Sequence, residues 1–180
     1  MNNVQIIFNL FLILITNTSY LYGEERDPGQ KYPQKNYTSS KLAPFNLEYF
    51  EISTRTGGDF YFWAPNEFSS KPATEILAKS ILRKNEKPLL YQFGELSGKK
   101  QEYTIFLSEN LPEVFFLIGI QSKNKIHIYK PNGELLSDST KNSKVYNFIH
   151  MMVATVTKPV PGNWKIEIAG TGKYLVSVRP

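Results

Sequence analysis

The sequence contains no cysteine among its 180 residues. This absence excludes disulfide bonds, cysteine-ligated zinc, thiol nucleophiles and Cys-x-x-Cys redox chemistry. Small exported domains often rely on disulfides for stability. We therefore expect the hydrophobic core alone to hold this fold together.

The chain is also poor in histidine and has no long run of like charge. Its two histidines, His127 and His150, have no spacing that would bring several metal ligands together. The formal net charge is +5, but lysines and acidic residues are interspersed along the chain. This pattern is typical of a solvated surface, so we expect no nucleic-acid binding, while weak attraction to an acidic polysaccharide stays open.

Common catalytic motifs are missing as well. The sequence has no nucleophile elbow, no phosphate-cradling loop and no His-Glu-x-x-His helix. Its carboxylates are scattered over expected turns and outward-facing strand positions, and sequence alone does not locate a pair facing each other across a cleft. We expect a protein that is not an enzyme and that uses no metal ion or other cofactor.

An apolar run from Ile6 to Ile15 lies close to the N-terminus. Its length of about ten residues suits the hydrophobic region of a signal peptide and is too short to span a membrane. Gly23 is small enough for cleavage, although Leu21 is larger than usual at its position and no Lys or Arg precedes the run. We predict a signal peptide over residues 1–23 and a secreted, extracellular protein; a buried N-terminal helix is the alternative.

The next segment, residues 24–46, is rich in Pro, Gln, Lys, Ser and Tyr. This composition predicts a disordered linker. Asn36 begins the triplet Asn-Tyr-Thr, which is an N-glycosylation sequon if the source is eukaryotic. Asn36 is therefore a candidate glycosylation site.

A cluster of aromatic residues follows the linker. Gly57 and Gly58 permit a sharp turn, and residues 59–63 then read as a short strand rich in rings. Four consecutive rings cannot all be buried on one side of a strand, so we expect two of them to be exposed or covered by a following helix. Because contiguous exposed rings usually mark an interface, Tyr61 and Trp63 are the candidate contact surface.

One helix is predicted after this cluster. Ser69 and Ser70 offer caps, Pro72 suits the first turn, and the helix should end near Asn85. Its expected buried face recurs at helical spacing and consists of Ala73, Ile76, Leu77, Ser80 and Ile81.

From residue 98 onward the sequence predicts only strands and turns. The continuous apolar run Val114–Ile120 is typical of a strand in the centre of a sandwich. The other expected strands are separated by Gly and Pro and cover residues 103–107, 125–129, 145–149, 151–156, 164–168 and 174–178. The triplet Gly170-Thr171-Gly172 is expected to reverse the chain between the last two. This spacing predicts a mainly β protein with an antiparallel β-sandwich over residues 98–180.

Trp164 stands at the head of one expected strand, directly after a Pro-Gly turn. Sugars stack on exposed tryptophan rings, which makes it a tempting binding residue. Its phase, however, matches Ile166 and Ile168 on the apolar face. We expect Trp164 to be part of the core.

Two groups of motifs resemble a known family. The first is YFEIS at residues 49–53, then TGG at 56–58, then an aromatic strand and an amphipathic helix. It resembles the closing segment of a von Willebrand factor A domain, in which a helix ending in a Thr-Gly-Gly turn precedes the last strand and the last helix. The resemblance implies a strand–helix appendage over residues 47–97.

The second group comprises IYKPNG at 128–133, VTKPVPGNWKI at 156–166 and GTGKYLVSV at 170–178. It is similar to the β-sandwich that follows the A domain in hemicentins. The resemblance implies a jelly-roll or galactose-binding-like sandwich. It also implies a secreted adhesion or matrix module that binds an extracellular protein or glycan, as part of a larger extracellular assembly.

The sequence departs from the family in its metal site. An A domain that binds through magnesium needs an Asp-x-Ser-x-Ser motif, and Asp138-Ser139-Thr140 does not fit it. Metal-dependent adhesion is therefore not implied. The chain is either a truncated relative, or its residues 47–97 are reused to cap the sandwich. Two other functions stay open, namely a carbohydrate-binding accessory domain of a separated hydrolase and a purely structural remnant.

Overall fold

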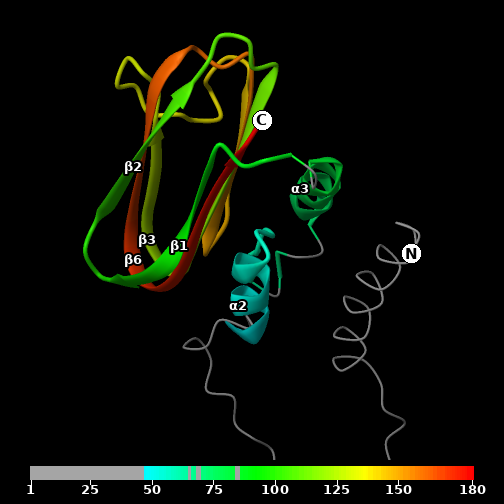
Figure 1. The fold of residues 1–180 in the computed structure, drawn as a ribbon, viewed down its shortest axis with the longest axis vertical. Helices are drawn as coiled ribbons and strands as arrows, with labels where there is room; N and C mark the ends of the chain where they lie inside the picture. Colours follow the sequence, from blue (N-terminus) through cyan, green and yellow to red (C-terminus); the bar gives the residue numbers. More distant parts are fainter. Residues whose placement is uncertain (1–46, 65, 68–69, 84–85) are drawn as a thin grey trace, which may run out of the picture. The chain divides into compact units, whose positions relative to one another are not determined.

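A computed structural model describes residues 47–180 apart from residues 65, 68, 69, 84 and 85 (Figure 1). All of the described residues belong to one compact unit. The predicted signal peptide, the predicted linker and Asn36 lie outside the described residues. Within the described part, no helix is long and apolar enough to cross a membrane.

The described residues form a mainly β structure with one antiparallel, six-stranded sheet and two short helices (Figure 1). In chain order the elements are α2 (Leu47–Arg55), α3 (Lys71–Leu82), β1 (Leu90–Ser97), β2 (Gln101–Leu107), β3 (Glu113–Tyr129), β4 (Ser143–Asn147), β5 (Met151–Thr157) and β6 (Gly162–Arg179). The strand order is β1-β6-β3-β5-β4, and β2 pairs with β6 outside this path. The expected antiparallel, mainly β fold is thus confirmed.

The two long strands, β3 and β6, each contribute to both layers of the sandwich. The C-terminal half of β6 pairs with β1, its N-terminal half pairs with β2, and β3 follows β6 along most of its length. The strands predicted at 125–129, 164–168 and 174–178 are present, but they are not separate. The first is the end of β3, and the other two both belong to β6.

Glycines let β6 bend where it was expected to reverse. A Cβ at Gly170 would lie under 3.0 Å from the carbonyl oxygen of Ser122, so only glycine allows the two strands to approach here. Gly172 has a φ of 83°, which glycine adopts at no steric cost. The ladder between β3 and β6 is also irregular between Ile120 and Ser122, as in a β-bulge. These residues bend the strand from one layer into the other.

The apolar run of β3 is buried on both of its faces. Phe116 and Ile118 belong to the main core, between the two layers of the sandwich. Phe115 and Leu117 alternate with them and belong to a second cluster on the opposite face of the layer. Burial on both faces explains why the run is continuous rather than alternating.

The second cluster is covered by the segment that precedes the sheet. Three of its buried residues come from this segment. They are Phe50 of α2, Phe62 of the stretch between the helices, and Ile76 of α3. Residues 59–63 run along this face without strand pairing, so the predicted strand was wrong. Its rings pack onto the sheet, and the Asp59 carboxylate accepts a hydrogen bond from the Ser177 hydroxyl at 2.9 Å.

The start of helix α3 agrees with the sequence prediction, and the start of the sheet differs from it. The predicted helix is confirmed as α3, and the hydroxyl of Ser70 accepts the backbone N–H of Ala73 at 3.3 Å, as an N-cap does. The sheet begins earlier than expected, because Leu90 already pairs with Val178 in β1. β1 is therefore part of the sandwich rather than of the appendage.

Candidate ligand-binding groove

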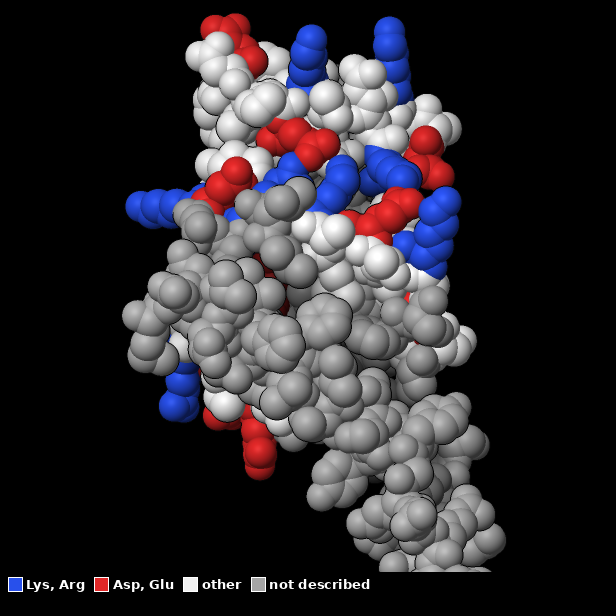
Figure 2. All heavy atoms as spheres, turned by 90° about the vertical axis from the view of Figure 1, so that its right-hand side faces the viewer, with Lys and Arg blue, Asp and Glu red and all other residues white. Residues whose placement is uncertain are grey.

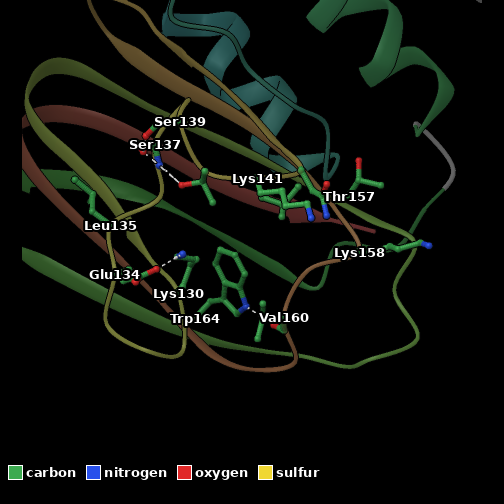
Figure 3. Close-up of a pocket in the computed structure, with 13 residues that line it drawn as sticks. Lys130, Glu134, Leu135, Ser137, Ser139, Lys141, Thr157, Lys158, Val160 and Trp164 are labelled. Carbon is green, nitrogen blue, oxygen red and sulfur yellow. Dashed lines mark hydrogen bonds and ion pairs between the residues drawn. The ribbon is translucent and has the colours of Figure 1, made fainter.

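A groove of about 630 Å³ opens where loops connect the strands at one end of the sandwich (Figure 3). Residues 130–142, which link β3 to β4, form one wall. The other wall comes from residues 156–160, at the end of β5 and in the turn towards β6, and Trp164 of β6 lies between the walls. Binding residues concentrate on loops that a rigid scaffold positions, which makes this end of the sheet the first candidate site.

The first wall begins with a tight turn. The N–H of Gly133 donates to the carbonyl of Lys130, and the N–H of Lys130 donates to the carbonyl of Glu134, both at 2.9 Å. Gly133 has a φ of 84°, in the left-handed region that favours glycine. The N–H of Leu136 then returns to the carbonyl of Ile128 at 2.7 Å, so the turn is tied to β3.

Hydroxyl groups hold the rest of this wall in place. The hydroxyls of Ser137 and Ser139 are 2.8 Å apart, and the N–H of Ser137 donates to Oγ1 of Thr140 at 3.1 Å. Ser143 donates from its hydroxyl to the carbonyls of Ser137 and Thr140, at 3.0 and 2.7 Å. Short polar side chains that bond the nearby backbone stabilise turns of this kind. The wall therefore presents its hydroxyls in a pre-organised array.

The second wall is anchored to its surroundings by hydrogen bonds and packing. The N–H of Lys158 donates to the carbonyl of Pro112 at 2.8 Å, and Nε1 of Trp164 donates to the carbonyl of Val160 at 2.9 Å. A Cβ at Gly162 would lie 3.1 Å from Pro131, so the turn after Val160 packs closely against the opposite loop. Both walls are therefore fixed to the sheet.

Backbone conformations in the left-handed region coincide with this groove. Asn142 has a φ of 62° and Lys158 a φ of 50°, and they are the only non-glycine residues with positive φ in the described part of the chain. Both line the groove, and the N–H of Thr157 donates to the carbonyl of Asn142 at 2.9 Å. A left-handed conformation costs an L-residue about 1 kcal/mol, and such outliers cluster at functional sites.

The groove carries a positive charge that the partners present among the described residues do not neutralise. Three lysines and one glutamate line it. The ammonium group of Lys130 pairs with Glu134. Lys141 and Lys158 are exposed, and the side chain of neither forms an ion pair or a hydrogen bond with any described residue. In Figure 3 Lys141 lies beside Thr157, and Lys158 extends outward, away from the indole of Trp164.

A second group of titratable side chains lies on the outer face of the layer that contains β2. Glu102, Glu167 and His127 face one another across β2, β6 and β3. Lys125 lies 2.9 Å from Glu167 and lowers the pKa of that carboxyl, while Lys100 lies 2.9 Å from Glu102 and lowers its pKa in the same way. Both carboxylates are thus held ionised by lysines.

The two histidines add no metal-binding site to these ion pairs. Partial burial lowers the pKa of His127, and its Nδ1 lies 3.0 Å from the hydroxyl of Tyr129. His150 stands just before β5, and burial lowers its pKa too. Among residues 47–180 that the structure describes, no three His, Cys, Asp or Glu side chains form a group suited to a metal ion. The described charged side chains of the outer face are therefore paired with one another and form no metal site.

Opposite charges also alternate on a face around the helices. Figure 2 shows basic and acidic side chains interspersed there rather than gathered in a patch of one sign. Glu113 contacts Arg83 and Lys79, and Glu75 lies 2.6 Å from Lys144. In the groove, by contrast, one lysine on each wall has no ion-pair partner among the described residues.

The structure places Tyr61 and Trp63 away from the groove, against the second cluster. Both are partly buried, with their rings stacked at 5.8 Å between centroids, and Trp63 meets the edge of Phe148 at 4.8 Å. Burial is the largest influence on the hydroxyl of Tyr61 and raises its pKa. Packing accounts for these rings, and their use as a contact surface stays a prediction.

The prediction for Trp164 is confirmed, because it is 1% exposed and belongs to the main core. Sequence reasoning missed Lys141, Asn142 and Lys158. The available signal for the first two was the density of Ser, Thr, Asn and Lys over residues 137–143, of which only residues 138–140 were compared with a metal-binding motif.

No protein-family model matches the chain, and no curated protein is significantly similar to it.

Proposed function

We propose that this chain is a secreted, non-enzymatic binding module that recognises an extracellular protein or glycan. The groove carries this proposal. Its walls are pre-organised by hydrogen bonds, two of its lysines have no ion-pair partner among the described residues, and two of its residues have a left-handed backbone. Pre-organisation favours binding because little conformational entropy is lost when a ligand is ordered against the site.

The motif resemblance to hemicentins supports an adhesive or matrix-forming role for such a module. Under this proposal the segment that resembles the end of an A domain acts as a cap on the sandwich. Phe50, Phe62 and Ile76 would have that role, since their side chains cover the second cluster. The ligand contacts would then lie at the groove rather than on the cap.

The alternative is a carbohydrate-binding accessory domain that uses the outer face of the sheet. One observation favours it. Tyr129 and His127 lie side by side there, and the ammonium group of Lys165 lies 4.6 Å from the centre of the Tyr129 ring. A sugar could stack on the Tyr129 ring while the polar groups beside the ring form hydrogen bonds with the sugar hydroxyls. The ion pairs on this face make it the weaker candidate, because a ligand would have to displace them.

A binding array of glycans and matrix proteins tests the proposal. The full chain is applied with and without EDTA. The proposal expects specific binding to one class of ligand, unchanged by EDTA, because Glu134 is the only carboxylate among the described residues that line the groove, and it is paired with Lys130. An array on which nothing binds would contradict it and leave the structural remnant as the better account.

A further inference from the structure

The two unpaired lysines of the groove stand on opposite walls. Lys141 belongs to the loop between β3 and β4, and Lys158 to the turn after β5. Each ammonium group is exposed and has no ion-pair partner among the described residues. A cation that is not neutralised internally keeps its full attraction for an external anion.

The aromatic lining of the groove limits how a ligand is held. Among the described residues, Trp164 is the only aromatic one that lines it, and it is 1% exposed with its indole N–H donated to the carbonyl of Val160. No ring face is therefore offered for stacking by a base or a sugar. Single-stranded nucleic acids depend on such stacking platforms, which disfavours them here. A ligand is therefore held by charge, by hydrogen bonds and by contact with the exposed side chains of Leu135 and Val160, without ring stacking.

The polar part of the lining suits a sugar chain that carries anionic groups. Besides the lysines, the groove is lined by the hydroxyl-bearing residues Ser137, Ser139, Thr140 and Thr157. Hydroxyls both donate and accept, so they match the hydroxyls and ring substituents of a saccharide. Lysines on two walls match anionic groups that repeat along a chain, and hydrogen bonds to charged groups are the stronger ones.

We infer that the groove binds an anionic polysaccharide, with Lys141 and Lys158 contacting successive sulfate or carboxylate groups and the hydroxyl array contacting the sugars between them. This inference rests on the proposed function, because it names the ligand class of the binding module. Under this inference, Lys141 and Lys158 determine the preference for anionic sugars, and neither residue belongs to a catalytic or metal-binding motif.

The test measures the affinity of the full chain for a heparin-derived octasaccharide by titration calorimetry. The variant K141A/K158A should weaken binding by about tenfold or more, because two charge-assisted contacts are lost. The matched control is K71A/K99A, which removes the same charge at exposed positions that do not line the groove. This control should change the affinity less than about twofold, and K141R/K158R should retain it because the charges remain.

Three outcomes overturn the inference. Equal losses for K141A/K158A and K71A/K99A would show attraction to net charge without a site. An octasaccharide stripped of its sulfates and carboxylates that binds as well as the intact one would remove the role of anionic groups. An oligo-dT of similar charge that competes equally would reassign the groove to nucleic acid. Failure of the proposed function is a separate outcome, because in that case no glycan or matrix protein on the binding array would bind the chain.

Discussion

The ring of Phe62 lies directly against Gly119 in the middle of β3. A Cβ on Gly119 would stand under 3.0 Å from ring atoms Cδ2 and Cε2 of Phe62, closer than real Cβ contacts come. Phe62 is fully buried at this point. Because Gly119 has no side chain, the ring of Phe62 can pack against β3. This contact holds the capping segment, which contains Phe50, Phe62 and Ile76, against the sheet.

G119A is expected to lower the free energy of unfolding by about 1–3 kcal/mol, because the added methyl group overpacks a filled site. Urea unfolding measures it. The double variant G119A/F62L should recover part of the loss, since the two positions are in direct contact. Additive losses would show that Phe62 does not occupy the space above Gly119.

The buried pair Asp59–Arg179 gives a second prediction. Their side chains are 9% and 6% exposed, and Arg179 also donates to the carbonyls of Glu86 and Gly57. D59N should cost about 3 kcal/mol in urea unfolding, because it leaves a buried guanidinium without its counter-charge.

The matched control for this pair is E95Q. It breaks the exposed pair between Glu95 and Lys173, whose side chains are 66% and 33% exposed. A change within about 0.5 kcal/mol is expected there. If D59N cost no more than E95Q, the pair would not be what fastens the capping segment to the last strand.

The pH dependence of stability provides a third test. A hydrogen bond from Lys144, and then one from Tyr146, lower the pKa of Glu75 to about 2. Because the folded-state pKa is depressed, this contribution is present above the ordinary value near 4.5 and is lost as pH falls towards about 2. The urea midpoint of E75Q should therefore fall less over this window than that of the parent chain. Parallel curves for the two proteins would contradict the assignment.

Backbone strain at the groove gives a fourth prediction. At position 158, where φ is 50°, K158G should be more stable than K158A by about 1 kcal/mol, because glycine takes the left-handed region freely. Lys141 has no positive φ, so K141G should be no more stable than K141A. Thermal unfolding of the four variants decides this. The same preference at both positions would mean that the strain is not localised at Lys158.

The hydrophobic pattern predicted much of the fold. The run Val114–Ile120 and the helix that contains Ala73 and Ile76 were located correctly, because burial imposes a periodicity that is visible in sequence. The path of β6, by contrast, was not predicted correctly. Gly170 and Gly172 permit either a reversal or a bend, and pairing with the distant strand β3 decides between them.

The groove could not be predicted for a related reason. Lys141 and Lys158 are seventeen positions apart in sequence, and their wall positions depend on how two loops meet above the sheet. The left-handed backbone of Lys158 leaves no trace in residue type, since lysine, unlike asparagine at position 142, has no preference for it. By contrast, the burial of Trp164 was predictable from its phase with Ile166.

The central claim is that the ligand binds in the groove. Two-dimensional NMR of the ¹⁵N-labelled full chain, titrated with the heparin-derived octasaccharide, tests it most directly. The account predicts amide shift changes concentrated in residues 130–142 and 156–164. Changes concentrated instead around Glu102, His127 and Glu167 would place the ligand on the ion-paired face and contradict the account.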